Sequence, residues 1–156
     1  MEDRYLYKAK TTPKEKGEFN NVWVVGNLIV SNGKYYIHPV GNVVNVKNEI
    51  GRIIVMHEVI PDTICQCTGL KDKNGKLIWE NDVVKDLFSD TYAPIRYGSY
   101  QNCFDSTKAE HIGFYVDWSG KYTKNYRKDL GYFIHMVDAE AIGNIFDNPE
   151  LLEVQE

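Results

Sequence analysis

One stretch decides the fold: Thr68-Gly69-Leu70-Lys71-Asp72-Lys73-Asn74-Gly75-Lys76-Leu77-Ile78-Trp79-Glu80-Asn81-Asp82-Val83-Val84-Lys85. Asn74-Gly75 marks a tight turn, because such pairs tolerate the backbone conformation that turns require. The stretch then continues with two hydrophobic residues, a Glu-Asn-Asp corner and a valine strand, an order typical of the opening of small SH3-like barrels. We expect Asp82 to hold this corner by accepting hydrogen bonds from nearby backbone N–H groups.

The sequence outside this stretch also has a β pattern. Residues 22–30 are rich in β-branched side chains, and Asn32-Gly33 predicts a type I′ hairpin into residues 34–38. Asn148 and Pro149 predict the N-cap and first position of a short C-terminal helical turn. We expect further strands at residues 43–46, 50–60, 95–97, 112–118, 132–137 and 141–146.

Alternation along residues 112–118 predicts one core-facing row. This row consists of Ile112, Phe114, Val116 and Trp118. The expected fold is therefore all-β, with an N-terminal β unit at residues 1–62 and an SH3-like small barrel at residues 63–156. The two parts could also pack as a single domain.

Composition excludes two classes of protein. The 156 residues are 43% hydrophobic and 13% aromatic, which is typical of a packed fold and excludes a disordered chain. No apolar run reaches the roughly 20 residues that span a bilayer. The start, Met1-Glu2-Asp3-Arg4, lacks the basic and apolar segments of a signal peptide, so we expect a cytoplasmic protein with no membrane partner.

The charge distribution suggests a nucleic-acid hypothesis. Lys and Arg number 18 against 22 Asp and Glu, yet residues 121–128 concentrate cations and tyrosines. Cations contact phosphates and tyrosines stack on bases, as in single-strand binders. We favour a solvated hairpin instead, because an acidic protein repels a phosphate backbone. The candidate nucleic-acid residues are Lys121, Tyr122, Lys124, Tyr126, Arg127 and Lys128.

Aromatic residues suggest a protein interface. Eleven Tyr and three Trp exceed what a small β core needs, and Tyr and Trp are enriched at interface centres. The alternative is that these rings cover the barrel's own surface. The candidates, in the connection expected after the first barrel strand, are Tyr92, Tyr97, Tyr100 and Phe104.

Catalytic and metal-binding patterns have simpler explanations. Cys65-Gln66-Cys67 has one residue between its thiols, whereas zinc sites usually have two to four. His57-Glu58 begins like a zincin helix, but Pro61 would break the helix and the second His is missing. Glu80 and Asp82 are explained as corner residues. We therefore expect no metal, no cofactor and no enzymatic activity.

Three segments resemble the YopX family of bacteriophage and prophage proteins. Residues 63–84 resemble that family's central Thr-Gly-Leu-Lys-Asp-Lys-Asn-Gly-Lys motif and its Glu-Gly-Asp corner. Residues 141–152 resemble its closing Gly-Asn-Ile and Asn-Pro-Glu-Leu-Leu motifs, and residues 7–10 with 23–28 resemble its entry segment. The motif residues expected to be structural are Gly69, Asn74, Gly75, Asn81, Asp82, Gly143 and Asn144.

The chain departs from the family pattern at two positions. Cys67 stands where the family usually has Tyr, and Asn81 stands where it has Gly. Asn tolerates a left-handed backbone, so it can replace Gly at the corner. The resemblance implies an all-β fold, an SH3-like barrel in the C-terminal part and a phage or prophage gene. It implies no particular activity and supplies no catalytic residues.

Together these features predict a non-enzymatic phage or prophage accessory protein in the bacterial cytoplasm. Our leading hypothesis is a macromolecular interaction module that binds a host or phage protein, or a second copy of itself as a homo-oligomer. The alternative is nucleic-acid binding through residues 121–128.

Overall fold

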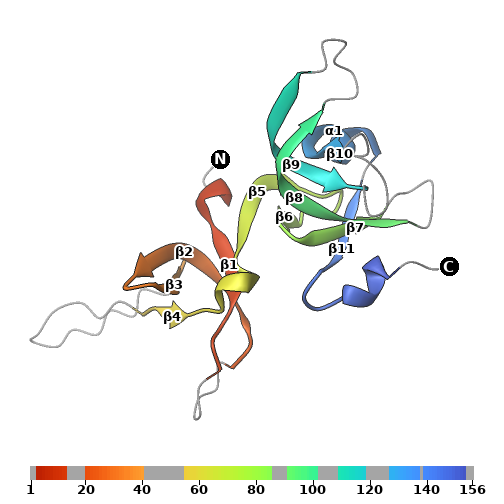
Figure 1. Cartoon of the computed structure of the whole chain (residues 1–156). Helices are drawn as coiled ribbons and strands as arrows, with labels where there is room; N and C mark the ends of the chain where they lie inside the picture. Colours follow the sequence, from red (N-terminus) through yellow and green to blue (C-terminus); the bar gives the residue numbers. More distant parts are fainter. Residues whose placement is uncertain are drawn as a thin grey trace, which may run out of the picture. The chain divides into compact units, whose positions relative to one another are not determined.

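Antiparallel strands make up most of the described chain (Figure 1). The computed structural model describes residues 3–13, 20–40, 55–85, 91–101, 109–118, 127–137 and 139–153. The strands are β1 (Tyr7–Lys10), β2 (Trp23–Ser31), β3 (Lys34–Pro39), β4 (His57–Glu58), β5 (Cys65–Lys71), β6 (Leu77–Trp79), β7 (Asp82–Lys85), β8 (Tyr92–Gln101), β9 (Glu110–Asp117), β10 (Arg127–Asp129) and β11 (Glu140–Asn144).

The strands form two sheets, and the expected all-β class is confirmed. One sheet has the order β4-β3-β2-β1-β5-β6 and the other has the order β10-β9-β8-β7-β11. Every strand pairing described within the two sheets is antiparallel. Among the described residues no pairing joins the two end strands of the five-stranded sheet, so the SH3-like barrel stays a prediction. Within the same residues, no helix is long and apolar enough to cross a membrane.

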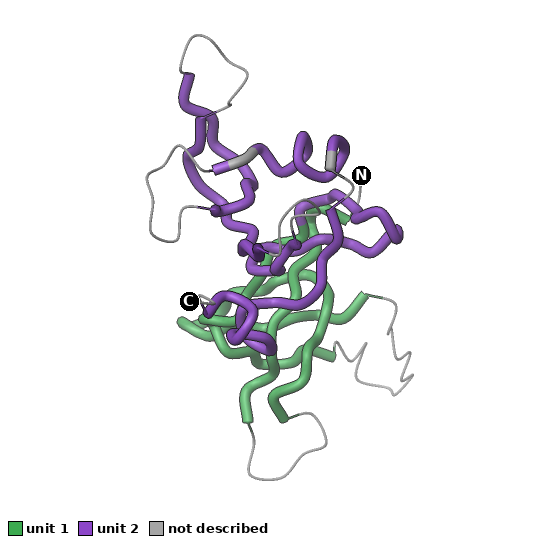
Figure 2. The backbone as a smooth tube through the Cα atoms, turned by 90° about the vertical axis from the view of Figure 1, so that its right-hand side faces the viewer, with its two compact units in different colours: residues 1–67 green, residues 68–156 purple. Residues whose placement is uncertain are grey.

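The chain divides into two compact units, Met1–Cys67 and Thr68–Glu156 (Figure 2). The division falls inside β5. Each unit has its own buried cluster: the first contains Ala9, Ile37 and Val59, and the second is built from β6, β7, β8, β9 and the helix α1 (Leu130–Val137). Burial of each large side chain in these clusters, such as Ile37, contributes roughly 1.5–3 kcal/mol before the entropy cost of folding.

The hairpin of β2 and β3 confirms the turn predicted at Asn32-Gly33. Ser31 pairs directly with Lys34, and both turn residues have positive φ angles of 50° and 74°. Only a type I′ turn needs φ > 0 at both central positions. The local sequence therefore sets the register of this hairpin.

The second unit contains a helix where the sequence predicted a strand at residues 132–137. Leu130, Phe133 and Ile134 are buried, a spacing of i, i+3 and i+4 that matches one face of a helix. Asp129 precedes the helix, and its Oδ1 accepts a hydrogen bond from the backbone N–H of Tyr132 at 2.8 Å. This is N-cap geometry, and it satisfies a donor at the first turn that the helix itself leaves unpaired.

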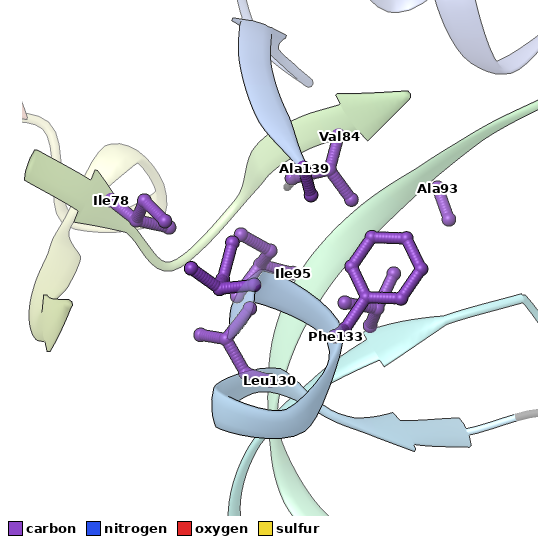
Figure 3. Packing of buried hydrophobic residues seen from close by; sticks show 9 residues of the cluster. Ile78, Val84, Ala93, Ile95, Leu130, Phe133 and Ala139 are labelled. Atoms are coloured by element: carbon purple, nitrogen blue, oxygen red, sulfur yellow. The ribbon is translucent and has the colours of Figure 1, made fainter. Parts of the chain in front are cut away.

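The helix covers part of the sheet. Leu130 and Phe133 point toward β8, which carries both Ile95 and Ala93 (Figure 3). Phe133 also lies against Trp118, with ring centroids 5.5 Å apart. The core of the second unit is thus a helix packed on one face of an antiparallel sheet.

Other expected elements differ in their bounds. β8 runs from Tyr92 to Gln101 rather than over 95–97, and β11 ends at Asn144 rather than at residue 146. The C-terminal helical turn exists as a 3-10 helix at Pro149–Leu152, but Asn148 makes no side-chain cap bond to it. Instead Asn148 Oδ1 accepts the N–H of Asn144 at 3.4 Å. The strand predicted at 43–46 and the first part of that at 50–60 lie outside the described residues.

Candidate functional site

An exposed row of apolar side chains lies on β8 and β9. The register pairs Ile95 with Val116, Tyr97 with Phe114, and Ser99 with Ile112. Because alternate residues of a strand share a face, Tyr97, Phe114 and Ile112 lie on the face that carries buried Ile95 and Val116. We call Tyr97, Ile112 and Phe114 the β8–β9 strip.

The strip is the uncovered continuation of a core face. Ile95 and Val116 are fully buried in the cluster that contains α1, whereas Tyr97 is 55% exposed and Ile112 is 75% exposed. Phe114 is half-buried and packs edge-on against Tyr97, with ring centroids 5.1 Å apart. The expectation that Ile112 belongs to the core is therefore wrong, because the row continues beyond the side chains that bury Ile95 and Val116.

The opposite face of the same strands holds a polar and aromatic cluster. Gly98 pairs with Gly113, and a Cβ at either position would lie 3.6 Å from the ring of Tyr115 or Tyr100, respectively. The rings of Tyr115 and Tyr100 therefore lie beside Gly98 and Gly113 at a distance that a Cβ would meet as an ordinary contact. Tyr100 also stacks with His111, at a centroid distance of 5.7 Å.

Two long-range contacts tie this cluster to β10. The Tyr100 hydroxyl donates to Asp129 Oδ2 at 2.6 Å. Burial, together with this hydrogen bond to a carboxylate, raises the pKa of Tyr100 to about 12, and burial raises the pKa of Tyr115 as well. Arg127 lies over the Tyr115 ring, 4.8 Å from its centroid, and its Nη1 donates to the Ser99 carbonyl at 2.7 Å. These contacts hold β10 on the sheet.

A third cluster joins the turn after β5 to the last strand. Asp72 is buried, and its Oδ1 accepts the backbone N–H groups of Asn74 and Lys76, both at 2.9 Å. Its Oδ2 accepts the N–H of Ala141 at 3.3 Å, and Lys76 Nζ donates to the Ala141 carbonyl at 3.2 Å. The predicted Asn74-Gly75 turn is thereby fixed to β11.

The corner before β7 is built as the sequence predicted. Asp82 is buried, and its Oδ2 accepts the N–H of Trp79 at 3.0 Å. Asn81 has φ of +65°, the left-handed conformation expected where the family pattern has Gly. The backbone N–H of Asn81 donates to the Ile95 carbonyl at 2.8 Å, and the Asn81 carbonyl accepts the N–H of Ile145 at 3.0 Å.

Comparison with protein families gives a match that covers most of the chain. The model described as YopX protein matches residues 18–153. The chain belongs to the YopX family. Among curated proteins, none matches it.

In this YopX-family chain, the motif residues serve the fold. Gly143 pairs with Val83, and Asn144 pairs with Asp82, so the closing motif lies beside the corner of the central motif. Asn144 Oδ1 accepts the N–H groups of Phe146 and Asp147, each at 3.0 Å, and shapes the turn that follows. The remaining motif glycines, Gly69 and Gly75, both have positive φ.

The predicted nucleic-acid residues lie mostly outside the described residues. Lys121, Tyr122, Lys124 and Tyr126 belong to that part, and only the backbone of Lys128 is described. Arg127 is described, and its guanidinium is engaged with Ser99 and Tyr115.

The predicted interface aromatics lie on a strand, not in a connection. Tyr92, Tyr97 and Tyr100 all belong to β8, while Phe104 lies outside the described residues. Tyr97 lies in the strip, Tyr100 lies on the opposite face, and Tyr92 begins the strand with Lys85 Nζ 5.8 Å from its ring centroid. The structure therefore does not gather the three described tyrosines into one surface. Ile112 and Phe114, which the sequence placed in the core, are the residues that join Tyr97.

The described residues that were considered for metal or acid–base chemistry lie within strands of the sheets or at the corner before β7. His57 and Glu58 form the short strand β4, and Glu58 pairs with Lys34 at 3.0 Å. Cys65 and Cys67 are buried on β5, and Cys103 lies outside the described residues. Across the residues described, no group of three or more His, Cys, Asp or Glu side chains is arranged to hold a metal ion.

Proposed function

We propose that this chain is a phage- or prophage-associated accessory protein that works by binding another protein through the β8–β9 strip. Membership of the YopX family suggests the phage association. The observation that carries the binding role is the exposure of Tyr97 and Ile112 on a row whose other end is fully buried.

The strip has the chemistry of an interface centre. Single apolar residues scattered over a protein surface are normal, whereas large contiguous apolar patches mark interaction sites. Tyr97 and Phe114 are cross-strand partners in edge-to-face contact, and Ile112 is the next residue of the row on β9. Aromatic side chains offer a large contact area at a low entropy cost. A partner that covers this row would complete a face that α1 covers only in part.

The acidic charge of the second unit indicates which charged groups we expect around the apolar centre of the partner's surface. The unit Thr68–Glu156 contains ten Lys or Arg residues against fifteen Asp or Glu residues. Glu110 lies on the same face of β9 as Ile112, two residues away. We therefore infer a partner with an apolar centre and a basic rim, because complementary charges steer association and disfavour wrong partners.

We propose no catalytic role for the acidic residues of this chain. Asp82 holds the corner before β7, and Glu58 is in an ion pair with Lys34. These acids have structural roles that account for their positions. We also favour a protein partner at the β8–β9 strip over nucleic-acid binding through residues 121–128. Arg127 already contacts Ser99 and Tyr115, so its guanidinium is engaged within the fold.

Site-specific photo-crosslinking tests the binding role. A photoreactive residue replaces Ile112 in the full chain, and the same residue replaces Val30, 59% exposed in the other unit, as a matched control. Crosslinking is carried out in the bacterial cells that carry the gene, and the mass of each product separates a second copy from a different protein. We expect a defined protein adduct from position 112 alone. Equal adducts from both positions, or none from either, would overturn the proposal.

A further inference from the structure

A second candidate surface lies on the first unit, on the sheet face opposite its core. Ala9, Val24 and Ile37 belong to or pack against the buried cluster of that unit. Their neighbours along each strand therefore point to the opposite face. We call this surface the Trp23 face, and it carries Lys8, Lys10, Trp23, Val25, Ile29, Lys34, Tyr36 and His38.

The face combines cations with aromatic rings. Lys10 pairs with Trp23 across β1 and β2, and Lys8 pairs with Val25. The ammonium groups of Lys8 and Lys10 lie 5.1 and 5.5 Å from the centroid of the Trp23 ring. Tyr36 lies further along the same face on β3, where it pairs with Ile29. Trp23, Ile29 and Tyr36 are each partly exposed.

The charge of this region favours an anionic ligand. The strands β1, β2 and β3 contain no acidic residue within their bounds. Among the described residues, Glu58 on β4 pairs with Tyr36 at the edge of this face, and its carboxylate forms an ion pair with Lys34. The unit Met1–Cys67 contains eight Lys or Arg residues against seven Asp or Glu residues, so the excess of acidic residues belongs to the other unit.

We propose that the Trp23 face binds single-stranded nucleic acid. Lys8 and Lys10 contact backbone phosphates, and a base stacks on the exposed part of the Trp23 ring, with Tyr36 as a second stacking position. Single strands suit this surface because their unpaired bases expose the ring faces that a duplex hides. An acidic peptide would match the lysines but would leave the aromatic rings without a stacking partner. This surface is separate from the β8–β9 strip, so the two proposals stand or fall independently.

Fluorescence anisotropy on the full chain tests this proposal. The probes are labelled single strands of DNA and RNA of about 15 nucleotides, a length at the upper end of single-strand site sizes, and the matching duplex. We expect tighter binding to a single strand than to the duplex. Replacing both lysines (Lys8→Gln with Lys10→Gln) should weaken binding about tenfold or more at low salt. It should also reduce the salt slope by about 1.4, because each single-strand phosphate contact contributes roughly 0.7.

A matched charge control separates this face from general attraction. Lys71→Gln with Lys73→Gln removes the same charge from the second unit, and we expect it to leave the affinity unchanged. Absence of binding at low salt, equal losses for the two lysine pairs, or equal affinity for the duplex would overturn the proposal.

The stacking contribution has its own test. Trp23→Phe keeps a ring and should keep most of the affinity, whereas Trp23→Leu should weaken binding about 5- to 150-fold, the range for one stacked base. Circular dichroism verifies that both variants fold. Wild-type affinity in Trp23→Leu, or displacement of the strand by polyglutamate as readily as by unlabelled DNA, would overturn the proposal.

Discussion

The carboxylate of Asp72, in the turn after β5, accepts a hydrogen bond from the backbone N–H of Ala141 in β11, 3.3 Å away. The two residues are 69 positions apart in the chain. The same carboxylate also closes its own turn through Asn74 and Lys76. One buried side chain therefore connects the two motifs that are characteristic of this family's sequence pattern.

Replacing Asp72 should destabilise the second unit. In Asp72→Asn, one acceptor oxygen becomes an NH2 group that faces a backbone donor. We expect a loss of about 1–3 kcal/mol in the free energy of unfolding, the usual cost of an unsatisfied buried polar group. Urea unfolding measures it, with exposed Glu153→Gln as a control that should change stability by less than about 0.5 kcal/mol. Equal stability of the two variants would mean that Asp72 is not a structural link.

Gly26 in β2 should tolerate no side chain. A Cβ there would lie 1.9 Å from the His38 carbonyl oxygen, which is backbone and cannot move aside. We expect Gly26→Ala to cost at least about 3 kcal/mol. Gly33→Ala is the control: its φ is +74° but nothing lies within 4 Å, so only about 1–2 kcal/mol of backbone strain applies. Thermal unfolding compares them, and a Gly33 variant at least as unstable as the Gly26 variant would contradict the packing described.

Asn81 should be replaced more easily by Gly than by Ala. Its φ of +65° strains any residue with a Cβ, and its side-chain oxygen accepts a hydrogen bond from Arg96. Asn81→Ala loses that bond and keeps the strain, at an expected cost of about 1–3 kcal/mol. Asn81→Gly loses the bond but relieves the strain, so its cost should be smaller. Chemical denaturation of both variants decides, and the opposite order would disprove the strain argument.

Stability should fall at alkaline pH through Tyr100. Its folded-state pKa of about 12 exceeds the ordinary value of 10.0, so the folded state retains a proton that the unfolded chain releases. This stabilisation is complete below pH 10 and is lost as the pH rises from about 10 to 12. Phenolate absorbance during alkaline titration should show one fewer tyrosine that ionises well above pH 10 in Tyr100→Phe than in the wild type. The same number of such tyrosines in both proteins would refute the assignment to Tyr100.

The sequence predicted features that depend on near neighbours. The Asn32-Gly33 hairpin, the Asn74-Gly75 turn and the corner at Asp82 each follow from a few adjacent residues. The helix at Leu130–Val137 was missed, because its apolar residues read as a short strand and Gly131 weakened the helical pattern. Asp129 as N-cap, followed by apolar residues at i, i+3 and i+4, was the signal that could have found it.

The candidate surfaces could not be predicted from local sequence, because they depend on how the strands pair and on which parts of them the helix covers. Alternation correctly placed Ile112, Phe114 and Val116 on one face, but it cannot reveal where along a strand the covering helix stops. Val116 is therefore buried while Ile112 is not. In the same way, the contact of Tyr100 with Asp129 follows from the register of β8, β9 and β10, which no local pattern encodes.

The most direct test of the central claim removes the strip and measures partner capture. A photoreactive residue at Gln101, on the same face of β8 as Tyr97, reports contact beside the strip without replacing it. Two backgrounds are compared in cells: the otherwise wild-type chain and the double variant Tyr97→Ser with Ile112→Ser. Ile112 is 75% exposed and Tyr97 is 55% exposed, so the double variant should fold, with a loss of about 0.5–1.5 kcal/mol from the Tyr97–Phe114 ring contact. We predict a defined protein adduct in the wild-type background and its loss in the double variant. An adduct of equal yield in both backgrounds would contradict the strip as the binding surface.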